Sequence, residues 1–303
     1  MNDIYKKQVA LLIRIMPSVY RIKDFAVHGG TAINLFHKNM PRYSVDIDLT
    51  YIPVKERAES LDAINNHLRT LKSYIEKSIP GIKVIHKHDV WKLQCTLDGA
   101  TVKIEVNGTK RGIIGETEDR KLCERAETEF NMTCKARTVS YSQLYGGKIA
   151  AALSRQHPRD LFDCKYMEMA SFHDVKNGFM LCLLGSDKPV IESLQPNAID
   201  QTEALEKQFE GMSDTPFTYS DYEEARHNLS QQTNDSLTET DREFLLSFEN
   251  GEPEWEKCCA GDLSRYPSVK WKLQNIAKLK KSNPQKHKAG LEKLQTFLFP
   301  KKG

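Results

Sequence analysis

Two stretches decide the fold: His28-Gly29-Gly30-Thr31, and Arg42-Tyr43-Ser44-Val45-Asp46-Ile47-Asp48-Leu49. An apolar run, residues 25–27, ends at the glycine pair. This order predicts a strand, a tight turn and then a helix over 32–37 that Thr31 caps. Residues 45–51 alternate apolar and acidic side chains, which predicts a second strand. Side chains two apart in a strand point to one face, so Asp46 and Asp48 should project together, with Ser44 alongside.

This pair of carboxylates predicts a magnesium site. Two carboxylates side by side repel each other unless a cation neutralises them. Mg²⁺ is usually held by one or two carboxylates plus substrate phosphates. Glycines let the main chain approach a phosphate closely, and the start of a helix attracts an anion. We therefore predict that Asp46 and Asp48 bind Mg²⁺. A nucleoside triphosphate (NTP) would supply these phosphates, and the residues predicted to bind it here are Gly29, Gly30, Thr31, Ser44 and Arg42.

A third acid lies in a later region of strand character. Three runs there have the strand pattern, 83–86, 90–97 and 101–106, and Asp98-Gly99 between the last two is a hairpin signal. In the third run Glu105 shares a face with Lys103. If this strand lies beside residues 45–51, Glu105 could complete the metal site or accept the proton of the attacking hydroxyl. Glu105 is therefore a candidate catalytic residue.

A lysine and two aspartates form a second constellation. Lys148 lies on a predicted helix, 144–155, where it shares a face with Arg155. Pro158 precedes a further predicted helix, 159–170. Lysine can act on a triphosphate as a point charge. Asp160 and Asp163 are one turn apart, and either could orient Lys148 or Arg155. We predict that Lys148 acts in catalysis and NTP binding, with Asp163 and Asp160 as further catalytic residues.

The order of elements predicts an α+β fold with two domains. A small mixed sheet is expected first, with helices over 4–20 and 55–78 packed against it. The pattern then becomes helical, with further helices over 201–250 and 268–280. A loop is expected over 185–200 and an irregular segment over 252–267. We place a catalytic core at 1–138 and a mainly helical domain at 139–303, which would contribute Lys148 and Asp163 to the active site.

Composition bounds the remaining possibilities. The 303 residues suffice for one large or two modest domains, and no apolar run is long enough to cross a membrane. Arg14 interrupts the apolar residues of the N-terminus, unlike in a signal peptide, so a cytoplasmic location is expected. Seven cysteines without a CxxC pair favour reduced thiols over a zinc site.

Net charge is +3, but the basic residues are uneven. A C-terminal cluster could attract phosphate backbones, or could simply be a solvated helical face and tail. The cluster comprises Lys278, Lys280, Lys281, Lys286, Lys288, Lys293, Lys301 and Lys302.

The segments together resemble the AbiEii/AbiGii group of nucleotidyltransferase toxins, from bacterial abortive-infection (phage-defence) and type IV toxin–antitoxin systems. The resemblance covers GGTAINLF, RYSVDIDLT and LYGGKIAAALSRQHPRDLFDCKYM, and the C-terminal segments FEGMSDTPFTYSDYEEARHNL, TETDREFLLSFENGEPEW and YPSVKWKLQNI. It implies a DNA polymerase β-like nucleotidyltransferase fold with a helical C-terminal region, Mg²⁺ as cofactor and an NTP as substrate.

The resemblance also implies roles for particular residues. It places metal and phosphate binding on the Gly-Gly-Thr turn, the serine and the two aspartates of the first motif, and later motifs on Lys148 and Asp163, with Asp160 adjacent. Glu105 matches no family motif and rests on strand geometry alone. The resemblance also implies the addition of nucleotides to tRNA 3′ ends, the activity attributed to the family's better-studied members, which blocks translation. A cognate antitoxin encoded nearby is therefore an expected partner.

Other functions stay open at this point. The same fold could transfer the nucleotide to a small molecule or a protein, although the basic C-terminal stretch favours RNA. A partner-binding scaffold without activity is a third possibility. The intact acids at Asp46 and Asp48, with Lys148 retained, argue against it.

Overall fold

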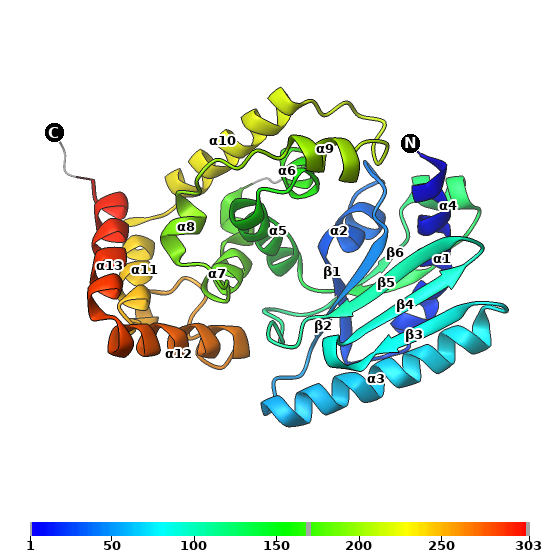
Figure 1. Ribbon diagram of the computed structural model, residues 1–303, viewed down its shortest axis with the longest axis horizontal. Coiled ribbons are helices and arrows are strands. Elements are labelled where there is room, and N and C mark those ends of the chain that lie inside the picture. Colours follow the sequence, from blue (N-terminus) through cyan, green and yellow to red (C-terminus); the bar gives the residue numbers. More distant parts are fainter. Residues whose placement is uncertain (1, 168–170, 301–303) are drawn as a thin grey trace. The chain divides into compact units, whose positions relative to one another are not determined.

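The computed structural model describes residues 2–167 and 171–300, which form two compact units (Figure 1). The first comprises Met1–Leu144 and Glu203–Phe217, and the second comprises Tyr145–Thr202 and Thr218–Gly303. The first unit therefore includes a segment from late in the chain. The predicted α+β class is confirmed. The domain boundary placed between residues 138 and 139 stays a prediction.

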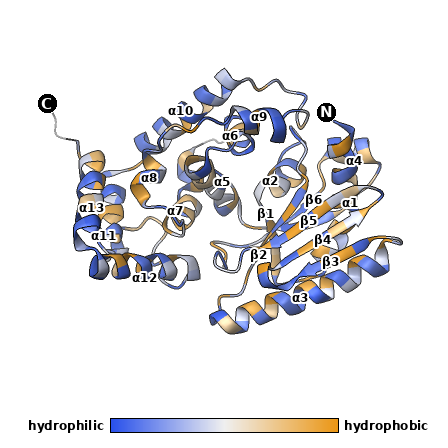
Figure 2. Cartoon of the chain, viewed as in Figure 1, coloured by the Kyte–Doolittle hydropathy of each residue, from blue (hydrophilic) through white to orange (hydrophobic). Residues whose placement is uncertain are grey.

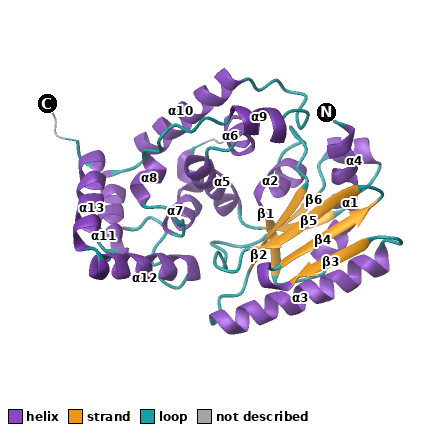
Figure 3. Ribbon diagram, in the orientation of Figure 1, coloured by secondary structure: helices purple, strands orange, loops and turns teal. Residues whose placement is uncertain are grey.

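A seven-stranded mixed sheet forms the centre of the first unit, in the order β3-β4-β5-β2-β1-β7-β6 (Figure 3). Strand β2 pairs antiparallel with β1 and parallel with β5, so it is the central strand. The strands are β1 (Phe25–His28), β2 (Asp46–Tyr51), β3 (Lys83–Lys87), β4 (Lys92–Leu97), β5 (Ala100–Val106), β6 (Glu118–Lys121) and β7 (Lys135–Thr138).

Two long helices cover the apolar face of this sheet. Helix α1 (Asp3–Tyr20) packs on β5 and β7, and α3 (Arg57–Ser78) packs on β3, β4 and α1. His67 of α3 contacts the rings of Phe25 and Tyr51, which shows which face the helices cover. Hydrophilic and hydrophobic residues alternate along α3 in Figure 2, because only one side of the helix is buried. The two helices predicted for this region are confirmed.

The turn between β4 and β5 forms as predicted. Asp98 and Gly99 both have positive φ, 49° and 80°, which is the backbone that a two-residue hairpin requires. Strand β4 begins at Lys92, two residues later than predicted. The reason is a short 3₁₀ turn at His88–Val90, after which Trp91 takes a left-handed conformation.

The second unit is helical, as the sequence predicts. The helix expected over 159–170 is α6, which begins at Pro158 and ends earlier than predicted, at Lys165; residues 168–170 lie outside the described residues. The loop expected over 185–200 is partly wrong, because it contains α8. The helices are α5 (Tyr141–Arg155, which starts in the first unit), α6 (Pro158–Lys165), α7 (Lys176–Leu184), α8 (Val190–Leu194), α10 (Tyr219–Asp235), α11 (Glu239–Glu249), α12 (Pro267–Ser282) and α13 (Pro284–Leu298).

Other elements complete the description. Helix α4 (Glu124–Phe130) lies between β6 and β7 in the chain, and α9 (Thr202–Gln208) belongs, from Glu203 on, to the late segment of the first unit. The seven cysteines carry free thiols, as predicted. Over the described ranges, none of the helices combines the length and the hydropathy needed to cross a membrane.

Candidate active site

One face of the central strands carries the predicted acids. Asp46 and Asp48 are half-buried on β2, whereas Ile47 and Leu49 between and after them are fully buried on the opposite face. The parallel pairing of β2 with β5 puts Glu105 beside Asp48. The condition for the Glu105 hypothesis, that its strand lies beside 45–51, is therefore met. Its role stays a prediction.

Two further side chains on this face were not assigned a role from the sequence. Lys103 is the register partner of Asp46, and His28 is that of Asp48. His28 Nδ1 lies 3.0 Å from Thr50 Oγ1, so one ring nitrogen is held by a neighbour on its own sheet. The alternation of β5 already indicates that Lys103 points to the side of Glu105.

The glycine pair opens a helix and does not form a separate turn. Helix α2 (Gly29–Thr31) follows β1 directly and continues into a π-helical segment, η1 (Ala32–His37). The prediction that Thr31 caps the helix is therefore wrong. The Thr31 hydroxyl instead lies 3.0 Å from Ser44 Oγ and donates to the main-chain carbonyl of Asp46. It fastens the start of the helix to the start of β2.

Both glycines sit where a side chain would not fit. Gly29 has φ of +70°, and a Cβ there would lie 2.5 Å from Asp48 Oδ2. A Cβ at Gly30 would lie 2.7 Å from the Arg42 guanidinium and 3.0 Å from Ser44 Oγ. The residues predicted from the two stretches thus come together in one place: the helix start, the Asp48 carboxylate, the buried Arg42 and Ser44.

Glu105 has a partner that the sequence analysis missed. Lys92 Nζ lies 2.6 Å from Glu105 Oε1. The hairpin register would have predicted this partner. A two-residue turn that pairs Leu97 with Ala100 also pairs Lys92 with Glu105. Half-exposed ion pairs of this kind contribute little stability. Glu105 can therefore exchange Lys92 for another partner at small cost.

The carboxylates of Asp46 and Asp48 would fit a Mg²⁺ ion that is also bound by substrate phosphates. Among residues 2–167 and 171–300, no group of three or more His, Cys, Asp or Glu is arranged to hold a metal ion. Asp46 and Asp48 offer two hard oxygen ligands from one strand face. Mg²⁺ commonly takes one or two protein carboxylates and completes its octahedron with phosphates and water. Two acids are enough for such a site.

Lys148, Asp160 and Asp163 form a buried ion cluster in the second unit. Lys148 Nζ on α5 lies 2.9 Å from Asp160 Oδ1 and 2.9 Å from Asp163 Oδ2, both on α6. The three side chains are at most 6 % exposed. Arg155, which is largely exposed, reaches Asp160 Oδ2 at 2.7 Å. The sequence left open which aspartate would contact Lys148; in the structure both do.

Electrostatics keep Asp160 charged within this cluster. Burial alone raises the pKa of Asp160, but the charges of Lys148 and Arg155 and the hydrogen bond from Lys148 outweigh it, and the pKa falls to about 2. Burial raises the pKa of the neighbouring Cys164 thiol well above its usual value, so this cysteine stays protonated. Asp160 is therefore ionised at neutral pH, and its carboxylate pairs with the ammonium group of Lys148.

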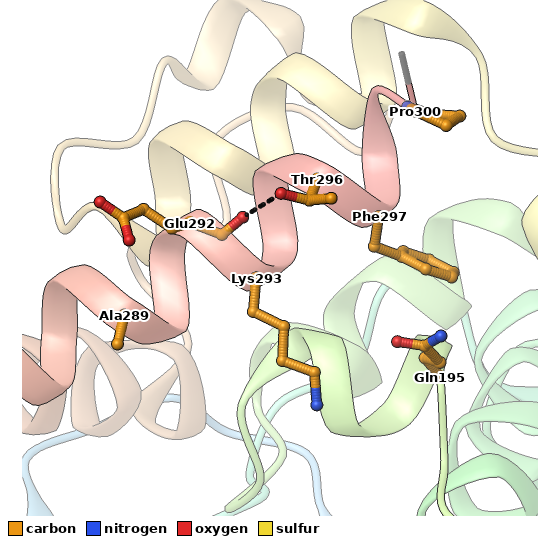
Figure 4. Close-up of a pocket in the computed structure, with 7 residues that line it drawn as sticks. All are labelled: Gln195, Ala289, Glu292, Lys293, Thr296, Phe297 and Pro300. Carbon is orange, nitrogen blue, oxygen red and sulfur yellow. Dashed lines mark hydrogen bonds between the residues drawn. The ribbon is translucent and has the colours of Figure 1, made fainter. Parts of the chain in front are cut away.

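An open pocket of about 660 Å³ lies elsewhere in the second unit (Figure 4). It is lined mainly by α13, and the side chains of Lys293 and Phe297 extend to the side on which Gln195 lies. None of the predicted site residues lines it, so the pocket is separate from the residues predicted to act in catalysis and NTP binding.

Comparison with solved structures shows the class of fold to which this protein belongs. The fold is that of a nucleotidyltransferase toxin. The chain superposes on MenT4, the nucleotidyltransferase toxin Rv2826c from Mycobacterium tuberculosis H37Rv, with a TM-score of 0.62 and 12 % identity, over 90 % of this chain and 93 % of that one. The predicted fold, a nucleotidyltransferase core with a helical C-terminal region, is thus confirmed.

The family follows from the sequence. Residues 11–275 match the family described as nucleotidyl transferase AbiEii toxin, type IV TA system. The match spans most of the chain, which therefore belongs to the AbiEii family of toxins, as its motifs suggest. A search of curated protein sequences found no match.

Proposed function

We propose that this protein transfers a nucleotide from an NTP, in the presence of Mg²⁺, to the hydroxyl of an RNA acceptor, with the tRNA 3′ end as the first candidate. Such a change would block translation, and an antitoxin encoded nearby would restrain it. The observation that carries the proposal is the placement of Asp46 and Asp48 on one face of the central strand, with Gly29 held against the Asp48 carboxylate.

The first unit would bind the substrate. Asp46 and Asp48 would hold Mg²⁺, which supplies neutralisation of the triphosphate and of charge that develops during transfer. Gly29 and Gly30 have no Cβ to block a phosphate from the N–H groups at the start of α2, and the side chains of Asp48, Arg42 and Ser44 lie directly beside these two glycines. Thr31, Ser44 and Arg42 would fix the shape of this phosphate cradle.

Lys148 would provide positive charge for the triphosphate. Asp160 and Asp163 would position its ammonium group, because both contact Nζ. Glu105 would accept the proton of the attacking hydroxyl after releasing Lys92. Catalysis would then come mainly from positioning and from electrostatic stabilisation of the transferring phosphoryl group.

The test is transfer of labelled nucleotide. The protein is incubated with total bacterial RNA, Mg²⁺ and each α-³²P-labelled NTP in turn, with Asp46→Ala as the control. We expect label in a tRNA-sized band with at least one NTP, reduced by about 10²–10³-fold in the variant, since loss of a group that stabilises transition-state charge costs on this order. The same gels identify the nucleotide.

Two results would contradict the proposal. Label in proteins or small molecules but not in RNA would place the acceptor in another class. Equal labelling of RNA by Asp46→Ala and wild type would exclude the carboxylate pair as the metal site.

A further inference from the structure

The lysines of α12 divide into two groups. The helix carries five lysines and no acidic residue. Lys272 is buried and lies near Glu249 at 3.8 Å, while Lys280 pairs with Glu252 at 3.0 Å. These two lysines attach the helix to the rest of the second unit. Lys270, Lys278 and Lys281 are exposed and form no ion pair within the described part of the chain.

The three unpaired lysines share one face with a tryptophan. Val269, Lys272 and Ile276 are buried and define the inner side of α12. At 100° per residue the opposite side bears Trp271 and Lys278, one above the other, with Lys270, Gln274 and Lys281 next to them. Trp271 is 53 % exposed, so much of its ring is available to a partner.

This face has the composition of a nucleic-acid surface. Lysines at 270, 278 and 281 extend over about 16 Å of helix, which spans several phosphates of a stacked strand at about 3.4 Å per nucleotide. An exposed indole can stack on any base, whereas glutamine and asparagine can bond base edges. Gln274 and Asn275 are exposed beside Trp271.

We propose that this outer face of α12, formed by Lys270, Trp271, Gln274, Asn275, Lys278 and Lys281, docks the RNA acceptor through its phosphate backbone and one stacked base. The inference rests on the proposed function, since it supplies the binding surface for that acceptor.

A lipid surface fits this face less well. Helices that lie on membranes bury a broad apolar side in the lipid. The apolar side of α12 is already buried in the protein, and its outer side offers one tryptophan among polar residues. Charge together with a single stacking ring matches RNA better.

The experiment measures binding alone. Fluorescein-labelled bacterial tRNA is titrated with the 303-residue protein, without NTP, and anisotropy is followed between 50 and 200 mM KCl. The variant Lys270→Gln/Lys278→Gln/Lys281→Gln should bind at least about 10-fold more weakly, and its slope of log K against log salt should be smaller by about 2, at roughly 0.7 per lost phosphate contact.

Matched variants separate this face from general charge. The control Lys77→Gln/Lys83→Gln/Lys121→Gln removes three exposed lysines of the first unit and should bind tRNA as wild type does. Trp271→Ala should weaken binding by roughly 10-fold with an unchanged salt slope, because it removes stacking and no charge. Trp271→Phe should restore most of the affinity.

Opposite results would overturn the inference. Equal losses of tRNA affinity in the α12 triple variant and in the control would show that net charge, and not this face, determines binding. Loss of binding to phosphatidylglycerol vesicles with unchanged tRNA binding would assign the face to a lipid surface. Asp46→Ala should still bind tRNA normally. If the wild type binds tRNA through α12 but does not label RNA with any NTP, the proposed function is contradicted. The docking surface would then still be supported.

Discussion

Replacing Gly146 with alanine is expected to lower the free energy of unfolding by an amount at or above the upper end of the ~1–3 kcal/mol that overpacking usually costs. Gly146 lies on α5 where that helix meets α7. An added Cβ would lie 2.2 Å from the main-chain nitrogen of Phe179 and 2.6 Å from main-chain atoms of Gly178 and Val175. Main-chain atoms cannot rotate away as side chains do, so the two helices would have to separate.

The next residue provides the matched control. A Cβ at Gly147 would meet Cys182 Sγ at 3.2 Å, which a small shift of that side chain relieves. Alanine is favoured over glycine inside a helix by about 1 kcal/mol, and this gain offsets the contact. Urea unfolding of the two variants should show a large loss for Gly146→Ala and almost none for Gly147→Ala. Equal losses would mean that the close approach of α5 and α7 does not exist.

Replacing Lys148 with methionine is expected to cost about 3–5 kcal/mol of unfolding free energy at neutral pH, the usual cost of removing one partner from a buried ion pair. The substitution leaves the carboxylates of Asp160 and Asp163 buried without the ammonium group that contacts both. Methionine has nearly the same length, so lost packing contributes little. Equilibrium unfolding in urea at pH 7 measures the effect.

The pH dependence gives this loss a signature. In the wild type the folded pKa of Asp160 is about 2, below its value of about 3.9 in an unfolded chain. Its stabilisation is therefore present above pH ~4 and is lost as the pH falls towards 2. Without Lys148 the buried carboxylates prefer to be protonated. The difference in stability between wild type and Lys148→Met should therefore shrink as the pH is lowered from 7 to 4.

A double variant distinguishes stability from chemistry. Lys148→Met/Asp160→Asn removes one of the uncompensated charges and should recover part of the lost stability. If this protein folds but no longer transfers nucleotide, the pair of Lys148 and Asp160 is needed by the reaction itself and not only for stability. A stability difference that stays constant between pH 4 and 8 would contradict the ion-cluster explanation.

The central strands and the acids on them were predictable because burial imposes a period of two. Alternation in β2 and β5 placed Asp46, Asp48 and Glu105 on defined faces, and the Asp98-Gly99 turn set the hairpin. Strands β6 and β7 escaped prediction for the opposite reason. Each has four residues, and β6 consists entirely of charged side chains, so neither carries a readable pattern.

Contacts between distant segments were less accessible. Thr31 has the residue type of a helix cap, yet its hydroxyl bonds Ser44 and Asp46 because β2 passes beside the helix start. Helix α7 is buried nearly all round, so it lacks the one-sided apolar stripe by which helices are recognised. The pairing of Lys148 with both aspartates depends on how α6 packs against α5, which helical spacing leaves undetermined.

The late segment of the first unit has a consequence for biosynthesis. Asn2 donates its main-chain N–H to the Gly211 carbonyl at 2.8 Å, and Arg42 forms a β-bridge with Ser213. These contacts cannot form until Ser213 has left the ribosome, about seventy residues after Leu144. At translation rates of about 5–20 residues per second this delay lasts roughly 4–15 s. During that interval the nascent chain carries Arg42 without its bridge partner, so the segment that we propose as part of the phosphate cradle gains this main-chain contact late in synthesis.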